Sequence, residues 1–232
     1  MEIGVNIYPQ FLNNWKSLPS VLADLKIKDY DFVQIFPHAL GLIKNGQVVE
    51  RGLRSIENAL KGVGVSYTIR MPTSVNLRDN TYYTRHFNVA KAVINVAIKL
   101  GAKVVVMQSG RTGRLDLEIE ALQQLAEMAE NFGIKIALEN TYSVKDTLYV
   151  VESVNKENLG FALDLGHAFL SAQGNEDKFL EDVKLGTEKT IILMIHDNFG
   201  KFFPKVDPID ALAVSYTHLR AHETPEHLVC RL

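Results

Sequence analysis

The repeating unit of this chain is clearest between residues 135 and 167, where the sequence reads KIALENTYSVKDTLYVVESVNKENLGFALDLGH. Two short apolar runs, Lys135–Leu138 and Gly160–Leu163, flank a longer amphipathic segment. A carboxylate follows each run, Glu139 after the first and Asp164 after the second. Alternation of this kind is typical of strand, helix and strand in a parallel sheet. We therefore expect both acids at the carboxyl ends of neighbouring strands.

The same alternation extends in both directions and predicts seven strands. They are Ile3–Ile7, Phe32–Phe36, Val65–Ile69, Lys103–Met107, Lys135–Leu138, Gly160–Leu163 and Ile191–Ile195. Gly62, Gly101 and Gly133 each stand shortly before a strand, where a left-handed residue commonly ends a helix. Strands that are apolar throughout are buried on both faces, as in a barrel or a doubly wound sheet. Because no glycine-rich phosphate loop follows the first strand, and polar residues recur at strand ends, we favour the barrel.

Composition points to one globular domain. The chain has 232 residues, 47% of them apolar, and a formal net charge of −2. Without a basic excess, nucleic acid is disfavoured as a partner. No apolar run approaches the roughly 18 residues that a membrane span needs, and the start lacks the pattern of a signal peptide. We expect a cytoplasmic protein, and Cys230 has no partner for an internal disulfide.

The C-terminal segment, residues 214–232, differs in character from the rest of the sequence. Residues 214–224, VSYTHLRAHET, resemble one reading frame of a transposase-type sequencing adapter, and residues 228–232 resemble its continuation after a short barcode. We predict a barrel over residues 1–213 and a non-native tail over 214–232; the alternative is a genuine polar, histidine-rich helix. If the tail is non-native, three of the seven histidines are no longer candidate ligands. His38, His86, His167 and His196 remain.

Polar side chains follow successive predicted strands. In chain order they are Gln34, His38, Arg70, Gln108, Glu139, Asp164, His167, His196 and Asp197. Adjacent strands lie about 4.8 Å apart, so Glu139, Asp164 and His196 could meet around one ion. Two oxygens and one imidazole suit Mg²⁺, Mn²⁺, Co²⁺ or Zn²⁺. Simpler interpretations stay open: Glu139 could bond to backbone at the rim, Asp164 could cap the next helix, and His196 could be a core residue.

Three of these motifs carry a resemblance to a known group of proteins. Residues 137–140 (ALEN), 163–167 (LDLGH) and 195–198 (IHDN) resemble the xylose-isomerase-like superfamily of TIM barrels. This group contains sugar isomerases and epimerases, inosose-type dehydratases and the endonuclease IV branch of apurinic-site nucleases. The likeness extends from the first strand to about Asp210. It implies a (β/α)8 barrel, truncated here after about strand seven because the chain diverts into adapter-like sequence.

The resemblance also implies roles for individual residues. The family's metal ligands fall on Glu139, Asp164 and His196, with His167 as a catalytic or substrate contact nearby. In epimerase members the strand-five glutamate also moves a proton, and a second glutamate ends strand eight. The family's strand eight has no counterpart in this sequence, so we expect the chain to have weak activity or none. We also expect unpaired edges on the first and last strands.

Two departures from the pattern help to choose a branch. Endonuclease IV relatives have zinc-binding histidines at the ends of strands three and four, where this chain has Arg70 and Gln108. Arginine cannot ligate a cation and glutamine ligates zinc poorly, which disfavours a three-zinc phosphodiesterase. Arg70 could bind a carboxylate, phosphate or sugar oxygen, and Gln108 could donate a neutral hydrogen bond. The alternative for Arg70 is a salt bridge at the rim.

The resulting hypothesis is an isomerase or epimerase that uses one divalent metal ion. Its substrate would be a small sugar or sugar-like hydroxyketone, converted through an enediolate, with Glu139 and His167 as catalytic residues. Arg70, Gln108 and His167 would bind the substrate. The alternatives are an apurinic-site nuclease and a barrel that binds a sugar without turning it over. The sequence leaves open whether the protein forms oligomers.

Overall fold

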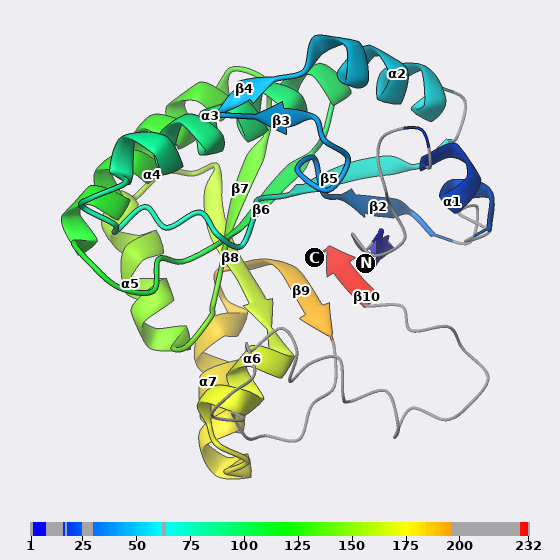
Figure 1. The fold of residues 1–232 in the computed structure, drawn as a ribbon. Coiled ribbons are helices and arrows are strands. Elements are labelled where there is room, and N and C mark those ends of the chain that lie inside the picture. Colours follow the sequence, from blue (N-terminus) through cyan, green and yellow to red (C-terminus); the bar gives the residue numbers. More distant parts are fainter. Residues whose placement is uncertain are drawn as a thin grey trace.

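The computed structural model describes residues 2–7, 16, 18–24, 30–61, 64–195 and 228–231. Seven parallel strands curl into a barrel-like sheet with helices around its outer side (Figure 1). These strands are β1 (Glu2–Asn6), β2 (Phe32–Ile35), β5 (Ser66–Arg70), β6 (Val104–Gln108), β7 (Lys135–Glu139), β8 (Leu159–Asp164) and β9 (Thr190–Ile195). Each overlaps one of the seven predicted runs, so the predicted α/β barrel is confirmed.

Helices connect most of the strands. They are α1 (Leu18–Asp24), α2 (Glu50–Leu60), α3 (Tyr83–Leu100), α4 (Leu115–Glu130), α5 (Val144–Val154), α6 (Leu165–Ser171) and α7 (Glu176–Thr187). A small antiparallel hairpin, β3 (Ile43–Lys44) and β4 (Gln47–Val48), precedes α2. Gly101 ends α3 in the left-handed region at φ 66°, as predicted, whereas Gly62 lies outside the described residues. No helix among the described residues has the length and apolar character to span a membrane.

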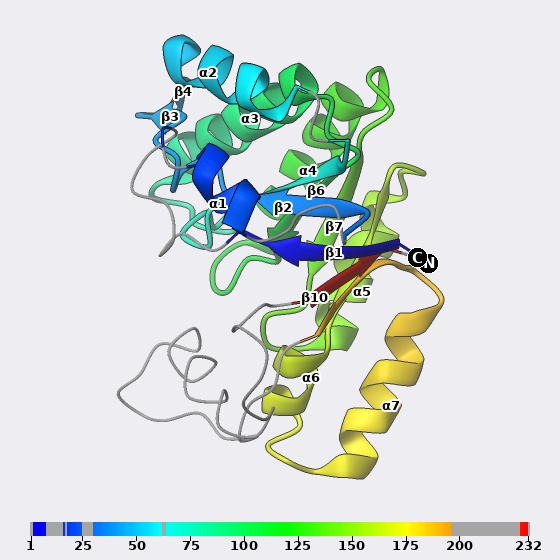
Figure 2. The same cartoon turned by 90° about the vertical axis from the view of Figure 1, so that its right-hand side faces the viewer.

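The eighth position of the sheet is occupied by a strand from the C-terminal segment. β10 (Leu228–Arg231) runs antiparallel to both of its neighbours, with Cys230 opposite Ile3 of β1 and Leu193 of β9 (Figure 2). The expectation that β1 and β9 have unpaired edges is therefore wrong. The two edges expose backbone donors and acceptors that a strand of either direction can satisfy. This pairing does not bear on the adapter origin of residues 214–232, which stays a prediction.

The interior of the barrel has its own small apolar core. It is made of Phe32, Val104, Val106, Ala137, Ala162, Ile192 and Met194, all buried, and is separate from the larger core between sheet and helices. Phe32 occupies the space over Gly4 on the adjacent strand: a Cβ on Gly4 would lie 2.4 Å from the Phe32 ring. Glycine at position 4 therefore makes room for the ring.

We expect Phe32→Ala to destabilise the protein by about 3 to 5 kcal/mol, because it leaves a cavity that neighbouring strands can fill only in part. Urea unfolding measures the loss. Phe132, which is 59% exposed, provides the matched control. Equal effects of Phe32→Ala and Phe132→Ala would contradict a packed barrel interior.

Candidate metal centre

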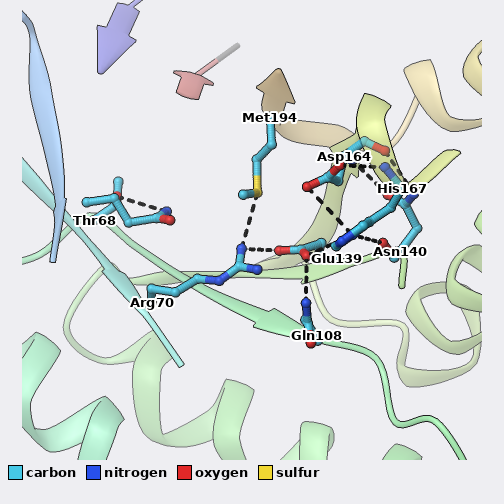
Figure 3. A network of polar contacts seen from close by, with 9 residues as sticks. Thr68, Arg70, Gln108, Glu139, Asn140, Asp164, His167 and Met194 are labelled. Atoms are coloured by element: carbon cyan, nitrogen blue, oxygen red, sulfur yellow. Dashed lines mark hydrogen bonds and ion pairs between the residues drawn. The ribbon is translucent and has the colours of Figure 1, made fainter. Parts of the chain in front are cut away.

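Glu139 is the central residue of the candidate site. It ends β7 and its side chain is fully buried. Gln108 Nε2, at the end of the adjacent β6, donates a hydrogen bond of 3.1 Å to Glu139 Oε1, and Arg70 Nη1 forms an ion pair with Oε2 (Figure 3). Burial alone would raise the pKa of Glu139, but the charge of Arg70 and the hydrogen bond from His167 hold it below its ordinary value. Glu139 is thus an ionised carboxylate inside the barrel.

Asp164 lies beside Glu139 on the next strand and has two roles. Its Oδ1 accepts a 2.8 Å hydrogen bond from the backbone N–H of His167, so Asp164 caps the N-terminus of α6. Helix capping was the simpler interpretation of this residue from the sequence. Asn140 ties the two strand ends together, since its Nδ2 donates to the Asp164 carbonyl at 3.0 Å and its Oδ1 accepts from the Asp164 N–H at 2.8 Å. Helix capping is therefore compatible with a role of Asp164 in the site, because the hydrogen bond to the helix fixes the Asp164 carboxylate in place.

The His167 ring completes the cluster from the first turn of α6. Its Nδ1 lies 3.0 Å from the Asn140 carbonyl oxygen, 3.3 Å from Glu139 Oε1 and 3.6 Å from Asp164 Oδ2. Burial alone would lower the pKa of His167, but the two carboxylates outweigh burial and raise the pKa to about 9. The imidazolium and Arg70 together balance the two acids in the metal-free protein.

The geometry suits a metal ion. One potential ligand atom from each of Glu139, Asp164 and His167 lies within 4.8 Å of the others, and all three residues are buried. Two anions so close together in the protein interior are costly unless cations compensate them. His196, the third ligand implied by the resemblance, lies outside the described residues.

Arg70 lies deeper than a rim residue. It ends β5 and is 6% exposed, and its Nη1 also lies 3.2 Å from the sulfur of Met194 on β9 (Figure 3). The salt bridge weighed as the alternative for Arg70 is present, but it is buried inside the barrel and its partner is Glu139. Gln108 is 8% exposed, and its NH₂ group faces a carboxylate. Its Oε1 therefore points elsewhere and accepts no hydrogen bond from the described part of the chain.

Three further residues around the site were not predicted as site residues. Asn140 directly follows Glu139, which was the only local signal for it. Thr68 lies two residues before Arg70 on β5, so the strand's alternation places both on the inner face, and its Oγ1 accepts from Gln34 Nε2 at 3.3 Å. Met194 shares the inner face of β9 with Ile192 and has no polar signal in the sequence.

Comparisons with known proteins agree with this architecture. A family model described as a xylose isomerase-like TIM barrel matches residues 22–223. An uncharacterized protein of Methanocaldococcus jannaschii is 31% identical over 218 residues, which is 87% of this chain and 80% of that protein.

Two solved structures have a similar fold. A D-tagatose 3-epimerase-like protein superposes with a TM-score of 0.67 at 22% identity, covering 87% of this chain and 78% of its own. A xylose isomerase-like TIM barrel protein from Mycobacterium smegmatis in complex with magnesium gives 0.61 at 16% identity, covering 78% and 71%. At these identities the likeness concerns the fold. The family model, which matches most of the chain, shows that the chain belongs to the xylose isomerase-like TIM barrel family.

Proposed function

We propose that this chain belongs to a divalent-metal-dependent isomerase or epimerase that acts on a sugar or sugar-like hydroxyketone. The observation that carries the proposal is the buried group of Glu139, Asp164 and His167, whose ligand atoms lie within 4.8 Å of one another. Carboxylate oxygens and imidazole nitrogen are ligands for Mn²⁺, Mg²⁺, Co²⁺ or Zn²⁺. A protein of similar fold was solved in complex with magnesium, which is consistent with a cation in a barrel of this kind.

Glu139 and Asp164 would hold the cation, with His196 as the third ligand and His167 as a further ligand or a substrate contact. When bound, the cation would stabilise negative charge on adjacent carbonyl and hydroxyl oxygens of a substrate. The donor set fits, because burial and mutual repulsion of the two acids are both relieved by a positive ion. Arg70 and Gln108, which contact the two oxygens of Glu139, would adjust when cation and substrate enter.

Glu139 would act as the base. It would take the proton from the carbon next to the substrate carbonyl; the electron pair of that C–H bond would form the carbon–carbon double bond of an enediolate, and the carbonyl oxygen would take up the negative charge. Return of a proton to the former carbonyl carbon would give the isomer, and return to the original carbon from the opposite face would give the epimer. A carboxylate paired with arginine is a weak base, so Arg70 would have to shift from Glu139 to a substrate oxygen, where its planar donors fit well.

Exchange of the substrate's proton with solvent deuterium tests this chemistry directly. Exchange needs only one base, so it reports on Glu139 without requiring complete turnover. We expect the protein with Mn²⁺ to label small ketoses at the carbon next to the carbonyl, and EDTA to stop the labelling. Mass spectrometry or proton NMR measures it. Tight binding of a ketose without labelling, across a panel of substrates, would favour a barrel that only binds sugar.

The number of bound metal ions separates the proposal from an apurinic-site nuclease. Arg70 and Gln108, both engaged with Glu139, occupy the strand ends where a three-zinc site would need imidazoles. We expect one divalent ion per chain by elemental analysis after dialysis. Three zinc ions per chain, together with cleavage of abasic DNA, would contradict the isomerase proposal.

A further inference from the structure

A third buried acid among the described residues, Glu118, lies outside the proposed metal site. It belongs to the first turn of α4 and its side chain is fully buried. The carboxylate accepts from Arg78 Nε at 2.6 Å, from the Gly110 N–H at 2.6 Å and from Ser109 Oγ at 3.2 Å. The bonds from Arg78 and Gly110 are short, as charge-assisted hydrogen bonds are, and the bond from Ser109 is longer.

The contacts of Glu118 join two loops at the mouth of the barrel. Arg78 lies in the segment between β5 and α3, and Ser109 and Gly110 directly follow β6. Arg78 also donates from Nη2 to Ser109 Oγ at 3.1 Å, and its carbonyl accepts from the Arg114 N–H at 2.8 Å. The Ser109 hydroxyl can thus accept from arginine while it donates to glutamate.

Two glycines let the loops approach this closely. A Cβ on Gly110 would lie 2.6 Å from Arg78 Cγ, and a Cβ on Gly113 would lie 2.0 Å from the Arg78 carbonyl oxygen. Gly113 also has φ 118°, a conformation that other residues rarely adopt. The backbone at Gly110 therefore packs against the Arg78 side chain, and the backbone at Gly113 packs against the Arg78 backbone.

This loop junction leads directly to Glu139. The Ser109 N–H donates to the Glu139 carbonyl at 3.0 Å, and the preceding residue, Gln108, donates from Nε2 to Glu139 Oε1 at 3.1 Å. Two consecutive residues thus hold the backbone and the side chain of Glu139. Glu118 in turn holds Ser109, because it accepts a hydrogen bond from the Ser109 hydroxyl.

We infer that Glu118 is a positioning residue: by fixing Ser109 and Gly110 it sets the orientation of the Glu139 carboxylate for cation and substrate. The inference rests on the proposed function. A residue that contacts a metal ligand directly typically changes metal affinity about 10- to 100-fold when it is altered. Glu118 acts one contact further out, through Ser109, so we expect an effect at the lower end of this range.

Glu118→Gln tests the inference, because it keeps the shape of the side chain and removes its charge. We expect Mn²⁺ affinity, measured by electron paramagnetic resonance, to fall about tenfold. Asp116→Asn is the matched control: it lies in the same helical turn, but its carboxylate is exposed and pairs with Arg114. We expect the control to bind Mn²⁺ like the unaltered protein. Ser109→Ala, which removes only the hydroxyl, should weaken binding in the same direction and serves if Glu118→Gln does not fold.

A second readout separates failure of this inference from failure of the proposed function. Hydrogen exchange of the Ser109 amide reports its bond to the Glu139 carbonyl without any metal. We expect faster exchange at Ser109 in Glu118→Gln than in Asp116→Asn. If the unaltered protein binds no Mn²⁺, the metal proposal fails and the amide exchange alone decides whether Glu118 positions the loop. A Glu118→Gln protein with lowered urea stability but unchanged Ser109 exchange and Mn²⁺ affinity would overturn the inference.

Discussion

Glu139→Gln is expected to lower the rate of deuterium exchange by about 10²- to 10⁴-fold, the usual contribution of a positioned base. The substitution keeps the hydrogen-bonding shape of the side chain but removes the charge that pairs with Arg70 and would hold the cation. Mn²⁺ affinity should fall as well, by more than the roughly 10- to 100-fold seen when an outer partner of a ligand is altered. Exchange rates at saturating Mn²⁺, compared with titrations by electron paramagnetic resonance, distinguish the two effects.

Glu130→Gln is the control for this experiment, because Glu130 is an exposed acid at the end of α4. It should leave both measurements unchanged. If Glu139→Gln bound Mn²⁺ as tightly as the unaltered protein, Glu139 would not be a ligand. If exchange also continued at the original rate, another group would be the base.

Arg70→Met is expected to destabilise the metal-free protein by about 3 kcal/mol, the lower end of the cost of leaving a buried charge without its partner. The loss should fall at this lower end because protonated His167 still faces the Glu139 carboxylate. A divalent cation at Glu139 would replace the lost positive charge. Since a ligand that binds only the folded state stabilises it, saturating Mn²⁺ should recover much of the loss.

Urea unfolding in EDTA and in excess Mn²⁺ measures this difference. Arg54→Met is the control, because Arg54 is an exposed residue of α2 and its loss removes one arginine from the surface of the protein. The informative quantity is the stabilisation by Mn²⁺, which should be larger in Arg70→Met than in Arg54→Met. Equal stabilisation of both proteins would place the cation away from Glu139.

Much of the fold and part of the site could be predicted from the sequence. The seven parallel strands and the strand-end positions of Glu139 and Asp164 follow from local apolar runs and from the residues that end them. Parallel strands carry their carboxyl ends to one mouth, so local order along the chain was enough to bring these two acids together. The resemblance to the family depended on short motifs at strand ends, including the two that contain these acids.

Several contacts depended on the closed sheet and could not be predicted. Arg70 pairs with Glu139 across 69 positions of sequence, and Arg78 pairs with Glu118 across 40. The strand-end position of Arg70 was visible in the sequence, but the partners of both arginines were not, because the choice of partner depends on strand register and on how two loops pack. The expectation of unpaired edges on β1 and β9 was wrong for the same reason: strand patterns do not reveal which distant segment pairs with an edge.

The amino-acid sequence by itself determined the type of fold, the order of its strands and the acids that end two of them, because periodicity and strand ends are local properties of the chain. Only the tertiary structure decided that Arg70 neutralises Glu139, that Asn140 joins two strand ends and that Glu118 fastens the neighbouring loop. Electrostatic pairing and burial depend on distances in space, and those distances exist only once the sheet has curled and its loops have packed together.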